Sequence, residues 1–142
     1  MCLLINNSKP KIADKDIICY KLVERTKIKG VYKAQYQEFE YIIRQLYTNN
    51  CDIEDVVLYT RYNRYLGEGL CVIREGMFHS FKDYLFSAML KNSFPNYTLL
   101  KCVIPKGAYY FKGTFGTLPS YASSQIKILE EISIYYIILL YF

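Results

Sequence analysis

Tryptophan is absent from this 142-residue chain, and histidine occurs once, as His79. The five cysteines, at positions 2, 19, 51, 71 and 102, form no C-x-x-C pair. Because zinc sites are built from paired cysteines and histidines, we predict no metal site, and we predict no cofactor. An odd number of cysteines, several of them inside apolar runs, indicates free thiols in a reducing, cytoplasmic setting.

Targeting segments and phosphate-binding loops are also missing. The apolar start at positions 1–5 is short and lacks the basic region of a signal peptide, and no stretch reaches the ~20 apolar residues of a transmembrane segment. The Gly67-x-Gly69 pair precedes no helix, and neither glycine-rich nucleotide motif is present. The net charge of +5 comes from scattered residues, so it permits a phosphate-bearing partner without requiring one.

Apolar residues make up 52% of the chain, and its length suits one domain, residues 1–142, with its own core. β-Branched and aromatic runs predict strands at 17–23, 70–73, 97–104, 108–112 and 124–129. Residues 38–47 and 121–131 fit either a strand or a helix, and strand is favoured; 1–14 and 113–120 are expected to be irregular. We expect an α+β fold: a small, mixed, mostly antiparallel sheet with one main helix, at about 81–91, packed on it.

The predicted helix begins at Ser80. Ser80 and Asp83 form an S-x-x-D pattern related to the capping box, and apolar residues repeat at helical spacing from Tyr84 to Met89. A helix start attracts anions through its free N–H groups, so His79 and Ser80 are candidate ligand-binding residues for a phosphate or carboxylate. The simpler interpretation is an ordinary cap beside a partly buried imidazole.

A second candidate binding segment is 59–65, in which tyrosines alternate with arginines. Tyrosine rings stack on bases and arginines pair with phosphates, so Arg61, Tyr62 and Arg64 would suit a nucleotide or a single-stranded nucleic acid. The simpler interpretation is a solvated loop whose tyrosines pack over the edge of the core. The 16 tyrosines of the whole chain are more simply explained by an A/T-rich genome.

Residues 132–142 carry no charge. This apolar tail suits a buried strand, and if exposed it would promote aggregation. A frameshift or a truncated gene is the alternative origin of such an end.

Three stretches resemble a known group of proteins. They are E-G-M-F-H-S-F at 75–81, followed by Ala88, then K-C-V-I-P-K-G-A-Y-Y-F-K-G at 101–113 and Y-A-S-S-Q-I-K-I at 121–128. Together they resemble small uncharacterised proteins of bacteriophages and mobile elements of gut Bacteroidales, over roughly residues 16–131. In that group Gly-Phe-His is expected where this chain has Gly76-Met77-Phe78-His79. The resemblance implies a phage or mobile-element origin and transfers no activity.

Two functions are consistent with these features. The first is a non-enzymatic accessory protein that binds a host protein, a nucleotide or a nucleic acid, with no catalytic residue. The alternative is an enzyme acting on NAD or a nucleotide, loosely similar to ADP-ribosyltransferases, that would use Arg61 or Arg64 with His79, Ser80 and Glu131. Because the Glu-x-Glu and His-Tyr-Glu patterns of such enzymes are missing, we favour the first.

Overall fold

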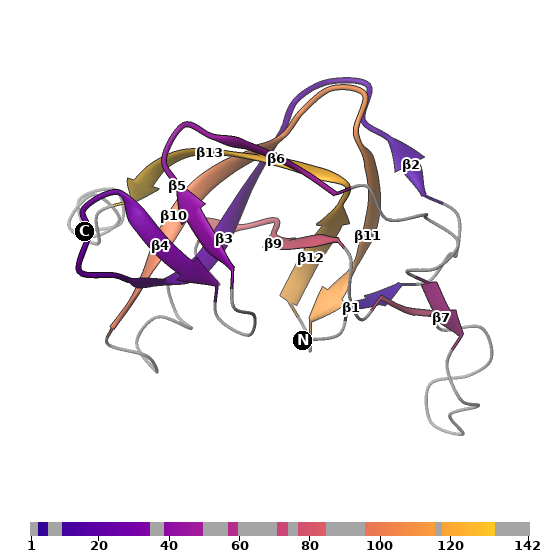
Figure 1. Ribbon diagram of the computed structural model, residues 1–142. Coiled ribbons are helices and arrows are strands. Elements are labelled where there is room, and N and C mark those ends of the chain that lie inside the picture. Colours follow the sequence, from indigo (N-terminus) through magenta and orange to yellow (C-terminus); the bar gives the residue numbers. More distant parts are fainter. Residues whose placement is uncertain are drawn as a thin grey trace, which may run out of the picture.

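The computed structural model describes residues 3–5, 10–34, 39–49, 57–59, 71–73, 77–84, 96–115 and 118–132 (Figure 1). All thirteen strands of this described part belong to one hydrogen-bonded antiparallel sheet. They are β1 (Leu3–Ile5), β2 (Lys11–Ile12), β3 (Ile17–Arg25), β4 (Val31–Ala34), β5 (Glu40–Ile42), β6 (Leu46–Thr48), β7 (Val57–Tyr59), β8 (Cys71–Ile73), β9 (Phe78–Phe81), β10 (Tyr97–Ile104), β11 (Tyr109–Phe115), β12 (Leu118–Ser123) and β13 (Gln125–Ile132).

The predicted α+β class is wrong, because the elements of the described residues are all strands, and among those residues only Tyr84 has helical geometry. The predicted helix start at Ser80 lies inside β9, and positions 85–91 lie outside the described residues. Backbone pairing explains the difference: Ser80 lies opposite Tyr121 of β12 and Phe81 opposite Tyr20 of β3. Pairing on both edges of β9, with aromatic residues that suit strands, outweighs the local capping signal of S-x-x-D.

The β3–β10 ladder forms the centre of the sheet. Eight residue pairs join the two strands, from Ile17 opposite Ile104 to Glu24 opposite Tyr97. Both faces of the ladder are buried, which explains the nearly continuous apolar sequence of each strand. One face carries Cys19, Val23 and Cys102 into the larger core cluster, and the other carries Leu22 and Leu99 into a smaller cluster with Phe81.

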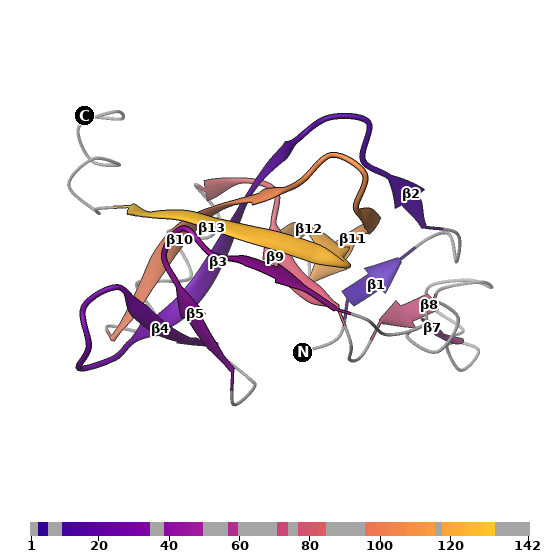
Figure 2. The same ribbon diagram turned by 45° about the horizontal axis from the view of Figure 1, so that its top comes forward.

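On one side the strand pairings form a circuit that is completed by the chain connection between β5 and β6. β3 pairs with β4, β4 with β5, β6 with β13, β13 with β10, and β10 with β3. The chain passes from β5 to β6 through a turn at 43–45, where Arg44 has a positive φ of 67°. This turn is attached to β13, since Arg44 donates to Ile128 O and Ile128 donates to Gln45 O. Figures 1 and 2 show these strands together at one end of the molecule, with β1, β7 and β8 at the other.

β3 changes its neighbour along one edge, and this change positions the candidate site. Near its middle, Tyr20 pairs with Phe81 of β9, whereas Val23, Glu24 and Arg25 pair with β4. The sheet therefore divides at Lys21 and Leu22. β9 continues to β12, β11, β1, β8 and β7, while β4 continues to β5.

The strand predictions at 17–23 and 97–104 are confirmed by β3 and β10, and the prediction at 124–129 lies almost wholly within β13. The preference for strand in 38–47 is confirmed by β5 and β6, and residues 71–73 of the predicted 70–73 strand form β8. The predicted 108–112 strand is found one residue later and continues to Phe115, so the expected 113–120 loop is wrong: most of it lies in β11 and β12. β1 and β2 likewise lie within the 1–14 segment expected to be irregular, and residues 133–142 of the apolar tail lie outside the described part.

A tight turn connects β10 to β11. Ala108 donates its N–H to Pro105 O, so the four turn residues are 105–108 and Gly107 is the third of them. Its φ of 90° is a conformation that glycine adopts easily and other residues rarely adopt.

Candidate functional site

Of the five predicted ligand-binding residues, the structure describes two. His79 and Ser80 lie in β9, opposite Ala122 and Tyr121 of β12. Ser80 is only 2% exposed, and the two buried imidazole nitrogens of His79 have no hydrogen-bond partner among the described residues. Burial, followed by the positive charge of Lys21, lowers the pKa of His79 to about 4. The imidazole is therefore neutral and enclosed near pH 7, unlike an anion-binding residue at a helix start.

The other three predicted residues, Arg61, Tyr62 and Arg64, lie outside the described residues. No geometry connects them to His79, so their convergence on one cleft stays a prediction.

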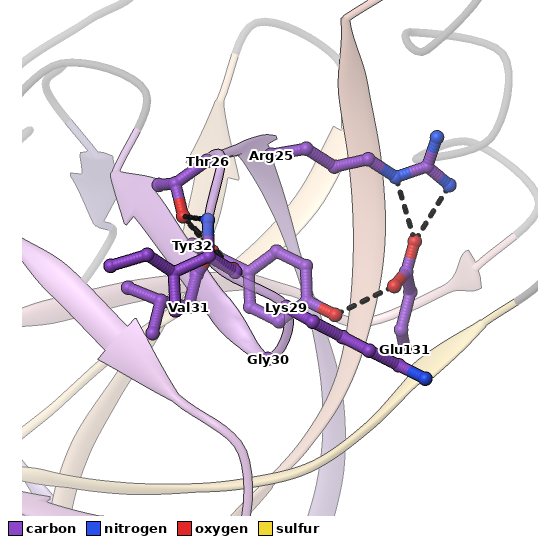
Figure 3. A pocket seen from close by; sticks show the side chains of 8 residues that line it. Arg25, Thr26, Lys29, Gly30, Val31, Tyr32 and Glu131 are labelled. Atoms are coloured by element: carbon purple, nitrogen blue, oxygen red, sulfur yellow. Dashed lines mark hydrogen bonds and ion pairs between the residues drawn. The ribbon is translucent and has the colours of Figure 1, made fainter.

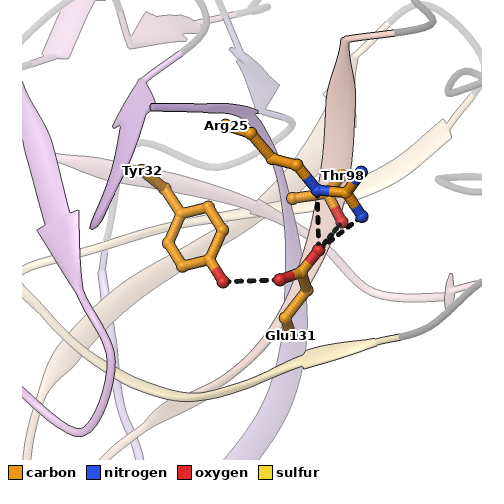
Figure 4. A network of polar contacts seen from close by, with 4 residues as sticks. All are labelled: Arg25, Tyr32, Thr98 and Glu131. Atoms are coloured by element: carbon orange, nitrogen blue, oxygen red, sulfur yellow. Dashed lines mark hydrogen bonds and ion pairs between the residues drawn. The ribbon is translucent and has the colours of Figure 1, made fainter. Parts of the chain in front are cut away.

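Glu131, which the enzyme hypothesis used, belongs to a different polar cluster (Figure 4). Its Oε1 accepts hydrogen bonds from Arg25 Nη2 at 2.7 Å, Arg25 Nε at 3.0 Å and Thr98 Oγ1 at 2.7 Å. Its Oε2 accepts from the Tyr32 hydroxyl at 2.6 Å. The four residues come from β3, β4, β10 and β13, so one carboxylate connects four strands at this end of the circuit.

The cluster shifts the pKa values of its members. Burial acts to raise the pKa of Glu131, but hydrogen bonds from Tyr32, Thr98 and Arg25 together hold it below its ordinary value. Burial and the Glu131 carboxylate raise the pKa of Tyr32 to about 12. Glu131 is thus ionised and Tyr32 protonated near neutral pH, as a stable hydrogen-bonded pair requires.

A pocket of about 260 Å³ adjoins this cluster, between the β3–β4 turn and Glu131 (Figure 3). Thr26 donates its hydroxyl to Val31 O, and Gly30, with a φ of 82°, completes the turn. Because Glu131 already accepts four hydrogen bonds, its oxygens have little capacity left for a ligand. We therefore interpret the cluster as a structural clamp.

A second pocket, of about 290 Å³, lies in the division of the sheet between β9 and the β5–β6 segment. We call it the aromatic pocket. Four rings line it, together with polar groups at positions 48 and 49 and one methionine; the lining residues are Phe39, Tyr41, Thr48, Tyr47, Asn49, Met77 and Phe78. Phe39, Tyr47 and Phe78 are half-buried, whereas Tyr41 is 3% exposed and forms the floor of the aromatic pocket.

The four rings hold one another in place. Tyr41 and Tyr47 meet edge to face, with centroids 5.3 Å apart and ring planes at 85°. Phe39 lies 4.9 Å from Tyr41, 5.4 Å from Tyr47 and 6.2 Å from Phe78. These separations are typical of favourable aromatic pairs, each contributing ~0.5–1.5 kcal/mol beyond its buried area.

Backbone contacts also fix Tyr47. The Ile42 N–H donates to the Tyr47 hydroxyl at 2.8 Å, which orients the ring from its polar end. Tyr47 lies opposite Ile126 of β13, and the Asn49 N–H donates to Ser124 O at 2.8 Å. The ring is therefore pre-organised, so a ligand would meet a surface that is already ordered.

The buried cysteines provide no nucleophile. Cys19 and Cys102 lie opposite each other on β3 and β10, and both are free thiols at 0% exposure. Burial raises the pKa of Cys19 to about 11 and raises that of Cys102 well above its ordinary value. The Ser80 hydroxyl lowers the pKa of Cys19 only in part. Both thiols thus stay protonated near pH 7 and behave as small apolar side chains.

Comparison with known proteins gives no relative: no family model, no curated protein and no solved structure matches this chain. The resemblance to phage and mobile-element proteins therefore stays a prediction. In the described part of the chain, no group of three His, Cys, Asp or Glu residues could hold a metal, and no helix is long and apolar enough to cross a membrane.

Sequence reasoning missed the aromatic pocket because its members are far apart in the chain. Phe39 and Tyr41 sit two residues apart, the spacing that places side chains on one face of a strand, and this was the one local signal. Nothing near Phe78 indicated that β9 would pass beside β5 and β6.

Proposed function

We propose that this protein is a non-enzymatic binding module, and that the aromatic pocket takes the base of a nucleotide or of a single-stranded nucleic acid. The supporting observation is the pre-organised group of rings formed by Phe39, Tyr41, Tyr47 and Phe78. Bases stack on aromatic side chains whatever their sequence, and each stacked base contributes ~1–3 kcal/mol. Thr48 and Asn49 at the pocket edge supply groups able to hydrogen-bond to a base.

Charge on the neighbouring surface supports the same ligand class. Arg44 is exposed in the turn that leads into β6, three residues before Tyr47. With a chain net charge of +5, this side chain suits a ligand whose base carries phosphate.

The alternative function, an enzyme acting on NAD or a nucleotide, receives less support. Its assigned Glu131 is bound by Arg25, Tyr32 and Thr98, and its assigned His79 is a neutral ring with buried nitrogens. An accessory role in a phage or mobile element, in the cytoplasm of a bacterial host, is the setting we propose, and it rests on the sequence resemblance alone.

Binding of fluorescently labelled oligothymidine and oligouridine, followed by anisotropy, tests the proposal. Phe78→Leu removes one ring of the aromatic pocket and should weaken binding roughly tenfold, as expected for one stacking contact. Phe115→Leu is the matched control, because Phe115 is also half-buried but packs in the other core cluster, against Phe81. It should bind like the wild type.

Two results would contradict the proposal. One is no binding of either oligonucleotide, which would favour a host protein as the partner. The other is binding that both variants retain fully and that heparin abolishes, because such binding depends on charge and not on the aromatic pocket.

A further inference from the structure

A buried lysine lies at the division of the sheet. Lys21 is only 8% exposed, and its alternating neighbours on β3, Cys19 and Val23, belong to the larger core cluster. Its Nζ donates a hydrogen bond to His79 O in β9 and lies 4.9 Å from the centre of the Tyr41 ring in β5. One ammonium group thus occupies the gap between the two branches of the sheet, against the floor of the aromatic pocket.

Among the described residues, this charge has no acidic partner. Within the described ranges the ion pair present is Arg25–Glu131, and no carboxylate lies at ion-pair distance from Lys21. A carbonyl oxygen and a ring face compensate a buried ammonium only partly, since an isolated charge is strongly disfavoured away from water. The Lys21 charge also contributes, after burial, to the lowered pKa of the neighbouring His79.

We infer that Lys21 determines ligand charge in the aromatic pocket, so that the pocket accepts flat rings that are neutral or anionic and rejects cationic ones. The inference rests on the proposed function and narrows its ligand class. Tyr41 connects Lys21 to the pocket, because its ring lines the pocket and also faces the Lys21 ammonium.

Electrostatics explains the selection. Aromatic cages that bind quaternary ammonium ligands use the negative faces of their rings. Here the Lys21 ammonium draws on the electron density of Tyr41 and repels a second cation at short range. A ring bearing carbonyl oxygens or a negative charge is attracted by the same field. Because the ligand and the Lys21 ammonium would lie on either side of the Tyr41 ring in a partly buried site, one unit of ligand charge should change the affinity by roughly tenfold.

Three ring compounds of similar shape test the inference: nicotinate, nicotinamide and 1-methylnicotinamide, with charges of −1, 0 and +1. Their dissociation constants are measured by NMR titration. The wild type should bind nicotinate at least as tightly as nicotinamide. It should bind 1-methylnicotinamide more weakly than nicotinamide, by a factor of roughly ten or more. Lys21→Met should bring the three constants close together, because it keeps the length of the side chain and removes its charge.

Two further variants act as controls. Lys33→Met removes an exposed lysine from β4 and should keep the wild-type order of the three affinities. Lys21→Arg retains the charge and should also keep it, so the inference stays testable if Lys21→Met fails to fold.

The outcomes separate the two proposals. The role of Lys21 would be overturned if the wild type bound 1-methylnicotinamide as tightly as nicotinamide, or more tightly. It would also be overturned if a folded Lys21→Met kept the wild-type order of the three affinities, or if Lys21→Arg lost that order. Binding of none of the three compounds would overturn this inference and the aromatic pocket together. The expected order without any oligonucleotide binding would leave the charge selection standing and overturn the proposed function alone.

Discussion

The stability of this protein should fall sharply between pH 7 and pH 5 because of one side chain. His79 has no hydrogen-bond partner for either buried ring nitrogen, and its pKa in the folded state is about 4, against 6.5 for an unperturbed histidine. The folded state therefore keeps the imidazole neutral, while the unfolded chain binds a proton below about pH 6.5. Protonation of the unfolded chain favours unfolding, so the contribution is intact above pH 6.5 and is lost as the pH falls toward 4.

The magnitude follows from that difference in pKa. A shift of one pKa unit corresponds to about 1.4 kcal/mol, so the full effect is about 3.5 kcal/mol and is reached below about pH 3. Between pH 7 and pH 5 the free energy of unfolding should fall by about 2 kcal/mol. The Glu131 carboxyl contributes little in this window, because its pKa lies below its ordinary value of 4.5.

Urea unfolding followed by circular dichroism at pH 7, 6 and 5 measures the effect. His79→Leu is the critical comparison, since it replaces two unpartnered nitrogens by apolar atoms of similar volume. The variant should be no less stable than the wild type at pH 5 and should show little change between pH 5 and pH 7. A wild type with no loss of stability in this window, or a variant with the same loss, would refute the reasoning.

Two further predictions concern groups outside the aromatic pocket. Thr98→Val removes a fully buried hydroxyl that donates to Glu131 and should lower the free energy of unfolding by about 1 kcal/mol in urea melts, whereas Arg25→Met should cost less, because the Arg25 side chain is 56% exposed. A larger loss for Arg25→Met would contradict the clamp as described. Cys19 and Cys102 should stay unmodified by iodoacetamide in the native protein at pH 8 and react after unfolding in urea, as peptide mass spectrometry can establish. Native-state alkylation at the rate of a free thiol would show that the two thiols are accessible.

The sequence predicted the strands that carry a strong local pattern. Ile17–Arg25 and Tyr97–Ile104 are nearly continuous apolar runs, and both became central strands buried on two faces. The helix start predicted at Ser80 was wrong, because Ser80, whose hydroxyl suits a cap in isolation, lies inside β9. Pairing of β9 with β12 is a contact between distant parts of the chain, and no local pattern reports it.

The candidate sites were less predictable for the same reason. Glu131 meets Arg25, Tyr32 and Thr98 only because four strands end together. Lys21 reads as an ordinary charged residue within an apolar run, yet it is buried where β3 changes its neighbour from β9 to β4. The burial of Lys21 depends on where three other strands lie, and no local sequence pattern shows their positions.

The position of β3 has a consequence for the order of folding events. Its longest ladder joins residues as distant as Ile17 and Ile104, and both β9 and β4 attach to the other edge of the same strand. The entropy of closing that long loop must be lost before the central ladder can form, so folding should be slow for a chain of this size, in the range of about milliseconds to seconds. On the ribosome, β3 could pair with β4 soon after synthesis, but its longest ladder would have to wait until β10 had been made.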